Sequence, residues 1–231
     1  MKLQNAVVFI TGANRGLGRA FAQAALAAGA AKVYAAARDP ASMDLPGVVS
    51  VALDVTDPAQ VAAAAARCAD VTLLINNAGI SRQGRLLGDD STAAARAELE
   101  TNFFGPWALA RAFAPVLQAN GGGAVLNVLS VLSWLSLPGA ATYSASKAAA
   151  WALSNGLRQE LKALGTQVTS LHVGYMDTDM TRGLDAPKAA PADIARLALE
   201  GIEAGAFEVL ADDISRQVKQ SLSTPEPAYA G

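Results

Sequence analysis

The sequence predicts an α/β fold, a single domain built on a doubly wound parallel sheet of about seven strands with helices on both faces. Short runs rich in β-branched residues alternate along the chain with alanine-rich stretches of helical character. In addition, 231 residues, 52% of them hydrophobic, suffice to cover both faces of one sheet. We see no linker, so we expect residues 1–231 to form one domain, with residues 221–231 as a loosely ordered tail rich in Ser, Pro and Ala.

The individual elements follow from the same alternation. The expected strands are short apolar runs at residues 6–10, 32–36, 48–52, 71–75, 124–129, 167–172 and 207–210. Helices are expected at residues 19–28, 57–68, 90–119, 142–164 and 192–204. Three glycines at positions 121–123 separate a helix from a strand, and we interpret them as an ordinary break rather than a phosphate-binding loop.

Composition and charge argue against several classes of function. The chain has 18 basic and 20 acidic residues, and no basic cluster indicates binding to nucleic acid or to an anionic membrane. A single cysteine, Cys68, gives no internal disulfide, and the single histidine, His172, has no cysteine cluster beside it, so we expect no metal site. We find no leader and no apolar run of membrane-spanning length, and we therefore expect a soluble cytoplasmic protein.

A glycine-rich turn predicts a dinucleotide site. Residues 11–18 read TGANRGLG and stand between the first expected strand and the first expected helix. In this position glycines let a pyrophosphate approach backbone N–H groups at the positive end of a helix. The spacing is T-G-x-x-x-G-x-G rather than G-x-G-x-x-G. A glycine turn also occurs without any ligand, so the prediction rests on its place directly after a strand.

A second motif sets a phenol, a cation and a hydroxyl together. Tyr143 and Lys147 are four residues apart and share one face of an expected helix, and Ser130 stands thirteen residues before the tyrosine. An ammonium beside a phenol favours the phenolate and lowers its pKa. Such a tyrosine can donate and accept protons, which predicts acid/base chemistry on a carbonyl or an alcohol.

Taken together, these motifs resemble the short-chain dehydrogenase/reductase family and, within it, carbonyl reductases. Four blocks match in order: residues 11–18, the run NNAG at 76–79, Asn102 with Ser130, and Tyr143 with Lys147. The resemblance implies a Rossmann fold, a nicotinamide cofactor and a catalytic tetrad. In that tetrad Tyr143 donates the proton, Lys147 lowers the pKa of Tyr143 and binds the nicotinamide ribose, Ser130 binds the substrate oxygen, and Asn102 holds a water. We expect nearby Ser133 and Ser136 to have no such role.

The choice of nicotinamide cofactor is argued from charge. An acidic residue at the end of the second strand would bind the ribose hydroxyls of NAD, but Ala37 stands there. Arg38 follows it, and Arg15 lies inside the glycine loop, so two guanidinium groups can converge on the 2′-phosphate of NADP. We therefore predict NADP(H). The alternative is that Arg38 is a solvated loop residue paired with Asp39.

The resemblance also implies the remaining cofactor contacts. Thr178 is the expected partner of the nicotinamide carboxamide, and Val173-Gly174 stands before it where the family usually has Pro-Gly. Asp179 is interpreted as a cap for the short helix that follows, and Asn76 as structural. The full set of expected cofactor-binding residues is Gly12, Asn14, Arg15, Gly16, Leu17, Gly18, Arg38, Asp54, Val55, Asn77, Ala78, Gly79, Tyr143, Lys147, Gly174, Met176 and Thr178.

The sequence thus predicts an NADPH-dependent oxidoreductase that reduces a ketone or aldehyde to an alcohol. Residues 133–138, with Tyr175, Met176 and Met180, suggest an apolar pocket wall and an apolar small-molecule substrate. Two alternatives stay open: an NAD-linked secondary alcohol dehydrogenase, and an NADP-binding redox sensor with little turnover. By resemblance, the long helices at 90–119 and 142–164 pair subunits in a homodimer or homotetramer, although some related carbonyl reductases are monomers.

Overall fold

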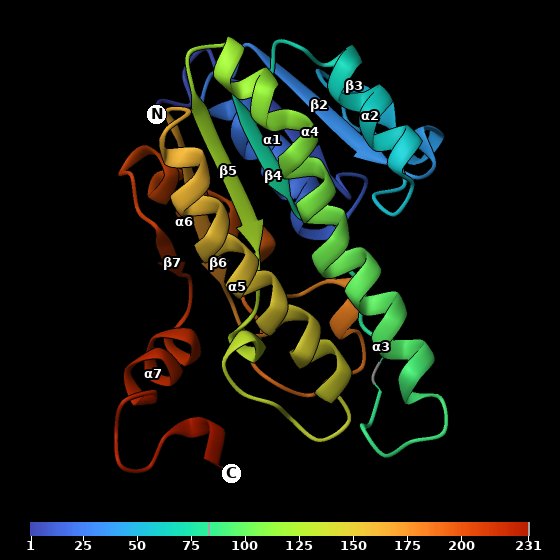
Figure 1. The fold of residues 1–231 in the computed structure, drawn as a ribbon, viewed down its shortest axis with the longest axis vertical. Coiled ribbons are helices and arrows are strands. Elements are labelled where there is room, and N and C mark those ends of the chain that lie inside the picture. The colour runs from blue at the N-terminus through green and yellow to red at the C-terminus, as the bar shows by residue number, and fades with distance from the viewer. Residues whose placement is uncertain (83, 231) are drawn as a thin grey trace.

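The computed structural model describes residues 1–82 and 84–230 and contains one seven-stranded parallel sheet (Figure 1). The strand order is β3-β2-β1-β4-β5-β6-β7, so the predicted fold class is confirmed. The strands are β1 (Val7–Thr11), β2 (Lys32–Ala37), β3 (Val49–Ala52), β4 (Leu73–Asn76), β5 (Gly123–Val128), β6 (Thr166–His172) and β7 (Glu208–Leu210).

Helices cover both faces of this sheet. They are α1 (Gly16–Ala27), α2 (Pro58–Arg67), α3 (Ser91–Leu99), α4 (Gly105–Ala119), α5 (Ala141–Lys162), α6 (Pro191–Glu203) and α7 (Asp213–Ser221). Most predicted elements begin and end within a few residues of these bounds. None of the helices in the described part of the chain has the length and apolar character needed to span a membrane.

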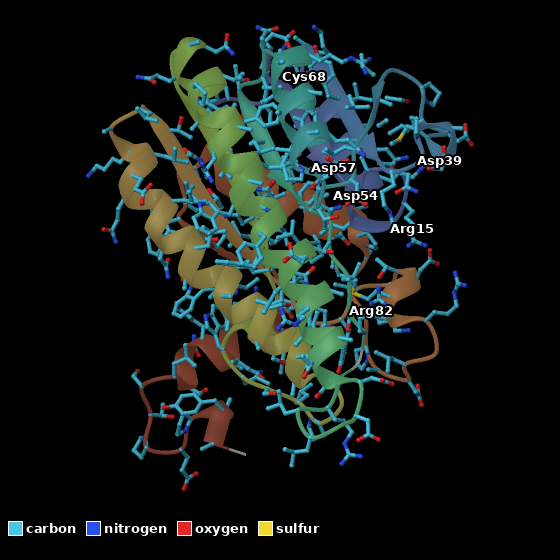
Figure 2. The ribbon with its side chains drawn as sticks, turned by 45° about the vertical axis from the view of Figure 1, so that its right-hand side comes forward. Arg15, Asp39, Asp54, Asp57, Cys68 and Arg82 are labelled. Atoms are coloured by element: carbon cyan, nitrogen blue, oxygen red, sulfur yellow. The ribbon has the colours of Figure 1, made fainter. Side chains whose placement is uncertain are left out.

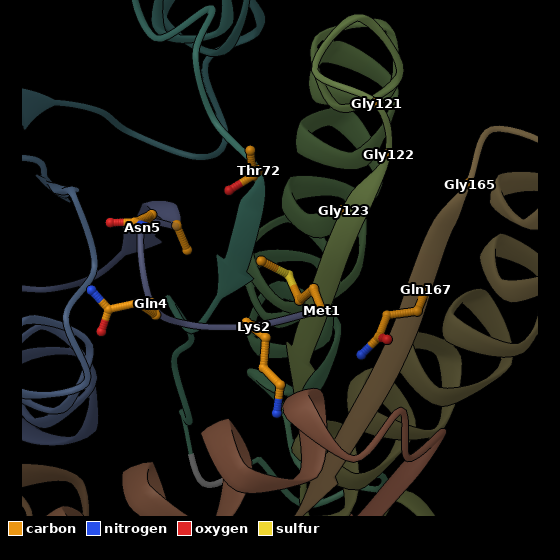
Figure 3. Close-up of a pocket in the computed structure, with 11 residues that line it drawn as sticks. Met1, Lys2, Gln4, Asn5, Thr72, Gly121, Gly122, Gly123, Gly165 and Gln167 are labelled. Atoms are coloured by element: carbon orange, nitrogen blue, oxygen red, sulfur yellow. The ribbon is translucent and has the colours of Figure 1, made fainter.

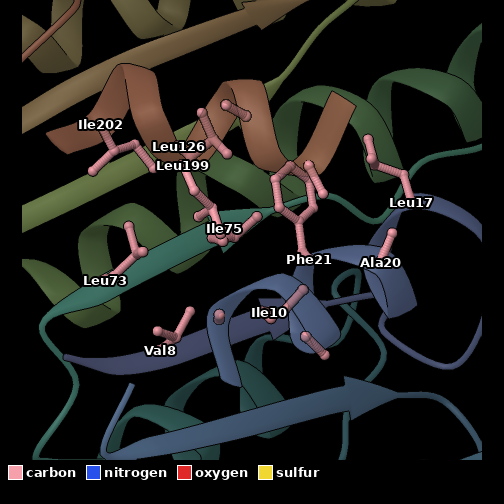
Figure 4. Close-up of a cluster of buried hydrophobic side chains, with 14 of the residues drawn as sticks. Val8, Ile10, Leu17, Ala20, Phe21, Leu73, Ile75, Leu126, Leu199 and Ile202 are labelled. Carbon is pink, nitrogen blue, oxygen red and sulfur yellow. The ribbon is translucent and has the colours of Figure 1, made fainter. Parts of the chain in front are cut away.

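The core has two layers because side chains alternate between the faces of each strand. On β1, Val8 and Ile10 point to one face, where they pack with Phe21 of α1 and Leu199 of α6 (Figure 4). Phe9 points to the opposite face and packs on the side chains of α2, α4 and α5, with its ring 4.8 Å from that of Phe113. The sheet is therefore buried on both sides, as the near-continuous apolar strands predicted.

The strand order also determines where a ligand can bind. β1 pairs with β2 on one side and with β4 on the other. The chain runs outward from β1 to β2 and β3, and then crosses back to β4 on the opposite side of β1. In open α/β sheets this switch point opens a crevice at the carboxyl ends of the strands. The glycine turn after β1 and the run at 76–79 after β4 both lie at this edge.

The amino edge of the sheet has a shallower depression of about 480 Å³ beside the first residues and the glycines at 121–123 (Figure 3). Gly121 and Gly122 have φ angles of 86° and 96°, which lets α4 end and β5 begin at once. A side chain at Gly122 would lie 2.3 Å from the carbonyl oxygen of Gly165. These glycines therefore form an ordinary break, as predicted.

Two features differ from the sequence prediction. The expected helix at 90–119 is interrupted by a π-helical segment, η2 (Glu100–Phe104), between α3 and α4. The second difference is α7, which the sequence did not predict because its residues are mostly polar. Beyond α7 the described tail consists of turns and a short 3-10 helix, η5 (Ala228–Ala230).

Candidate active site

The glycine loop packs tightly between β1 and the segment after β4. Gly12 and Gly16 have φ angles of 64° and 52°, which favour glycine. A Cβ atom at Gly18 would lie 2.1 Å from the carbonyl oxygen of Gly12, so the first turn of α1 approaches the loop at a distance that only glycine permits. Asn77 holds the loop from the other side, because its Nδ2 donates to the carbonyl oxygens of Thr11 (2.8 Å) and Gly12 (3.2 Å).

The start of α1 fits a pyrophosphate group. Arg15 is its N-cap residue, and its side chain accepts no hydrogen bond from the first turn, which also has no acidic residue. Within the described residues, the backbone N–H groups at this positive helix end thus have no side-chain partner, and they can donate to phosphate oxygens. Leu17 is buried in the core, so its contribution to a cofactor site would come from its backbone.

The expected adenosine end lies at the carboxyl ends of β2 and β3 (Figure 2). Arg38 is exposed directly after β2. The Asp39 carboxylate accepts from the backbone N–H of Ala41 at 2.9 Å and caps the 3-10 helix η1 (Pro40–Ser42). Within the described residues no ion pair joins Asp39 to Arg38. Asn14 reaches the same loop, where its Nδ2 donates to Ser42 Oγ at 3.1 Å.

The segments after β3 and β4 lie at the same edge of the sheet as the glycine loop. Asp54 accepts from the backbone N–H and the hydroxyl of Thr56, at 2.9 and 2.7 Å, and Val55 is buried beside it. Ala78 lies against the glycine loop: a Cβ atom added at Gly12 would come within 3.1 Å of the Ala78 Cα atom. A Cβ at Gly79 would lie 3.6 Å from Lys147 Nζ. The segment after β4 therefore touches the glycine loop with Ala78 and approaches Lys147 with Gly79.

The π-helical segment places Asn102 between the chain after β4 and α5. Asn102 Nδ2 donates to the carbonyl oxygen of Ile80 and to Ser146 Oγ, both at 2.9 Å. Its Oδ1 accepts from the backbone N–H of Ile80 at 2.9 Å. Both N–H donors of the side chain are thus used to hold the chain after β4 against α5. A π-bulge at such a position is common at functional sites.

Ser130 and Tyr143 meet at the main cavity of the protein. Tyr143 lies in the first turn of α5, and its hydroxyl lies near that of Ser130. Ser130 follows β5 as N-cap of the 3-10 helix η3 (Val131–Ser133), and its Oγ accepts from the backbone N–H of Leu132 at 3.1 Å. Ser133 is turned back, because its Oγ accepts from the backbone N–H of Ser130 at 3.4 Å. Ser130 and Tyr143 line the cavity, whereas Ser133 does not.

Lys147 lies one turn after Tyr143 and is buried. Its Nζ is 5.7 Å from the centre of the Tyr143 ring and donates to the carbonyl oxygen of Val128 at 2.8 Å. Burial lowers the pKa of Lys147 to about 8. Burial also raises the pKa of Tyr143, and the Glu98 carboxylate adds to this, while the hydrogen bond from Ser130 acts in the opposite direction. The predicted lowering of the Tyr143 pKa by Lys147 is therefore not seen, because burial raises that pKa instead.

A buried polar cluster behind Ser130 was missed by the sequence prediction. The ring of His172 stacks on Trp134 at 3.9 Å, and its Nδ1 lies 3.3 Å from the carbonyl oxygen of Ser130. Because a carbonyl oxygen only accepts, Nδ1 carries the hydrogen. Nε2 then faces Glu208 Oε1 at 3.8 Å, and Lys219 of α7 donates to the same carboxylate. The lone histidine thus supports the serine loop, and burial lowers its pKa to about 4.

The cavity has a volume of about 970 Å³ and mostly apolar walls. The loop after β6 lines the cavity with three residues that were predicted as cofactor contacts, Gly174, Met176 and Thr178. α7 forms a further wall of the cavity. Asp212, its N-cap residue, holds it against the loop after β6, because the Asp212 carboxylate accepts from the backbone N–H groups of Gly174 (2.6 Å) and Ser215 (2.8 Å). The apolar lining residues include Leu132, Leu135, Leu137, Pro138, Tyr175, Met180, Leu184, Pro187 and Ile214.

The sequence predicts that Asp179 caps the short 3-10 helix η4 (Asp179–Thr181), and this prediction is wrong. Thr178 is the N-cap residue of η4 instead. The Asp179 carboxylate forms one ion pair with Arg15, at 2.9 Å, and another with Arg182. The loop after β6 is thus joined directly to the glycine loop.

Comparison with known proteins places this site in a family. The family model for short chain dehydrogenases matches residues 6–189. Dehydrogenase/reductase SDR family member 7B of Bos taurus is 38% identical over 197 residues, which cover 78% of this chain and 60% of that protein. The chain thus spans about 60% of the length of these curated relatives. The 3-oxoacyl-(acyl-carrier-protein) reductase FabG of Salmonella typhimurium is 30% identical, over 80% of this chain and 79% of its own length.

Solved structures agree with this result. A short chain dehydrogenase from Burkholderia cenocepacia in complex with NADP is 42% identical, with a TM-score of 0.93 over 97% of this chain and 95% of that one. A short chain dehydrogenase/reductase from Burkholderia phymatum in complex with NAD is 25% identical, with a TM-score of 0.85 over 96% and 95%. The chain belongs to the short-chain dehydrogenase family.

Proposed function

We propose that this enzyme uses NADPH to reduce the carbonyl group of an apolar ketone or aldehyde. The observation that carries the proposal is the meeting of the Ser130 and Tyr143 hydroxyls at the wall of a large apolar cavity, with buried Lys147 one helical turn away. Two hydroxyls that converge on one point can bind a single carbonyl oxygen and supply a proton to it. A bound nicotinamide supplies the hydride.

The protein residues have distinct roles in this proposal. Ser130 donates a hydrogen bond to the carbonyl oxygen and orients it. Negative charge grows on that oxygen during reduction, and Tyr143 stabilises the charge and transfers its proton to the oxygen. The raised pKa of Tyr143 keeps the phenol protonated and ready to donate. Lys147 is a positive charge near the ring, which stabilises the phenolate that remains.

The preference for NADPH over NADH is argued from charge. Ala37 ends β2, where an acidic residue would favour NAD. Arg38 is exposed directly after it, and Arg15 stands in the glycine loop. The related Burkholderia cenocepacia protein was solved with NADP and the Burkholderia phymatum protein with NAD, so the proposal rests on these two arginines rather than on relatedness.

The substrate is proposed from the cavity. A volume of about 970 Å³ and walls of Leu, Met, Pro and Tyr side chains suit a bulky apolar carbonyl compound, and we propose a broad range of ketones and aldehydes. The similarity to a reductase of 3-oxoacyl chains is compatible with such a cavity. An NAD-linked alcohol dehydrogenase and an NADP-binding sensor remain the competing functions.

We also propose that two or more copies of the chain associate through α4 and α5. Phe104 and Trp107 are 43% and 40% exposed at the start of α4, and their rings stack at 6.2 Å. The ring of Phe103 lies 4.8 Å from that of Phe104. Three adjoining aromatic rings on a helix surface are an apolar patch that association would remove from water.

The first experiment follows the absorbance of NADPH and, separately, of NADH with a panel of aryl ketones, aliphatic aldehydes, diketones and quinones. We expect NADPH-dependent turnover that Tyr143→Phe lowers by about a hundredfold or more. Ser130→Ala should lose most of the turnover, whereas Ser133→Ala, whose hydroxyl points away from the cavity, should keep it. Tight NADPH binding without turnover would favour the sensor, and a preference for NADH would favour the dehydrogenase.

A further inference from the structure

The glycine loop carries a cation that already has an anionic partner. Arg15 Nη1 lies 2.9 Å from Asp179 Oδ2. The other carboxylate oxygen of Asp179 pairs with Arg182, so one carboxylate holds two guanidinium groups. The side chains of Arg15 and Asp179 are 69% and 45% exposed. Arg15 is thus held by a contact that water and salt can weaken.

This contact joins the glycine loop after β1 to the loop after β6. Arg15 is the N-cap residue of α1, and Asp179 begins η4 after β6. The loops also touch beside the ion pair, because a Cβ atom at Gly16 would lie 3.3 Å from Thr178 Cγ2. Arg15 therefore faces the loop after β6.

We propose that Asp179 is a specificity-determining residue, which competes with the 2′-phosphate of NADPH for the guanidinium group of Arg15. The inference rests on the proposed use of NADPH. When a 2′-phosphate binds, Arg15 exchanges its carboxylate partner for the phosphate. Asp179 stays paired with Arg182, so the exchange leaves no charge without a partner. A dinucleotide without that phosphate leaves the Arg15–Asp179 pair intact.

The direction of the effect follows from this exchange. Part of the attraction between Arg15 and the phosphate offsets the loss of the ion pair with Asp179. Since both side chains are exposed, we expect this penalty to be small, about three- to fivefold in affinity. Asp179→Asn removes the competing charge and keeps the size of the side chain. This variant should therefore bind 2′-phosphorylated ligands more tightly, and other adenine nucleotides unchanged.

The test measures binding rather than turnover. Titration calorimetry compares adenosine 2′,5′-bisphosphate with 5′-AMP, which differ only in the 2′-phosphate. For Asp179→Asn we expect an affinity for the bisphosphate about three- to fivefold higher than for the wild type, and no change for 5′-AMP. Asp177→Asn is the matched control, because it removes the same charge from the same exposed loop, and within the described residues Asp177 has no ion pair with Arg15. This control should bind both ligands as the wild type does.

The Arg15→Ala variant separates competition for the Arg15 guanidinium from simple repulsion between the Asp179 carboxylate and the phosphate. In Arg15→Ala, a further Asp179→Asn change should have no effect on bisphosphate binding, because the shared guanidinium is gone. An equal gain in both backgrounds would overturn the proposal, as would weaker binding by Asp179→Asn alone. A wild type that binds both nucleotides equally would refute the NADPH preference itself, and with it this inference. A clear preference that Asp179→Asn leaves unchanged would refute the inference alone.

Discussion

Lys147 is a buried cation whose charge state lies within the range of ordinary assays. Burial lowers its pKa to about 8, so the ammonium is charged below that pH and loses its proton as the pH rises past it. The proposed mechanism needs the charged form. We predict that kcat/KM for carbonyl reduction at low NADPH concentration falls above about pH 8, as a pH profile would show.

Tyr143 provides the comparison for this pH profile. Burial raises its pKa, so the phenol stays protonated when Lys147 has already lost its charge. A profile that stays level well above pH 8 would contradict the role of Lys147. Lys147→Met should remove both the activity and the pH dependence, because its side chain is uncharged at every pH.

Individual site residues could be predicted from the sequence where the chemistry requires one residue type. The expected pair of Ser130 and Tyr143 does meet, and the glycine spacing does mark a tight loop. His172 gave no such signal. Its position behind Ser130 depends on Trp134 and Glu208, which lie far from it in the sequence. A single histidine without a motif cannot be assigned such neighbours in advance.

Among the elements, the turn from β1 into α1 makes the sharpest steric demand. A Cβ atom at Gly18 would lie 2.1 Å from the carbonyl oxygen of Gly12, so Gly18→Ala must displace backbone. We predict that this change lowers the free energy of unfolding by about 2 kcal/mol or more and weakens binding of NADPH. Thermal or urea unfolding and a nucleotide titration measure the two effects.

Gly156 is the matched control for Gly18. It lies inside α5, is exposed, and a Cβ atom there has no atom within 4 Å. Because glycine disfavours the helix, Gly156→Ala should raise the free energy of unfolding by about 0.5–1 kcal/mol. Equal destabilisation by both changes would show that the close approach at Gly18 does not matter.

The prediction of elements was good for those with a strong apolar pattern and poor for the others. α7 shows few apolar residues, and its position depends on Asp212, which binds the backbone of Gly174 after β6. The π-helical turn around Asn102 is likewise a result of packing, because Asn102 must reach both Ile80 and Ser146. Neither contact has a local sequence signature.

For the whole molecule, the exposed aromatic residues at the start of α4 lead to a prediction about assembly. We expect the purified protein to have at least twice the 23.5 kDa mass of the chain in light scattering. Trp107→Glu places a charge in the aromatic patch and should shift the mass toward one chain. Leu87→Glu is the control, because Leu87 is 99% exposed outside α4 and α5. A wild type of single-chain mass would contradict the proposal.

The parallel sheet with helices on both faces could be predicted because the segments between the strands are long enough for parallel crossovers. The extent of the substrate cavity could not, since its walls come from η3, from the loop after β6 and from α7. These segments are brought together only by the completed fold.

The cluster behind Ser130 gives the protein an optical reporter. Trp134 and Trp151 meet edge to face at 6.3 Å, and the ammonium of Lys219 lies 4.8 and 5.4 Å from the centres of their rings. Lys219 belongs to α7, which also lines the cavity. Indole emission responds to nearby charge, so a movement of α7 as the cavity fills would change the intrinsic fluorescence. The entry of a substrate could then be followed by light, without any label.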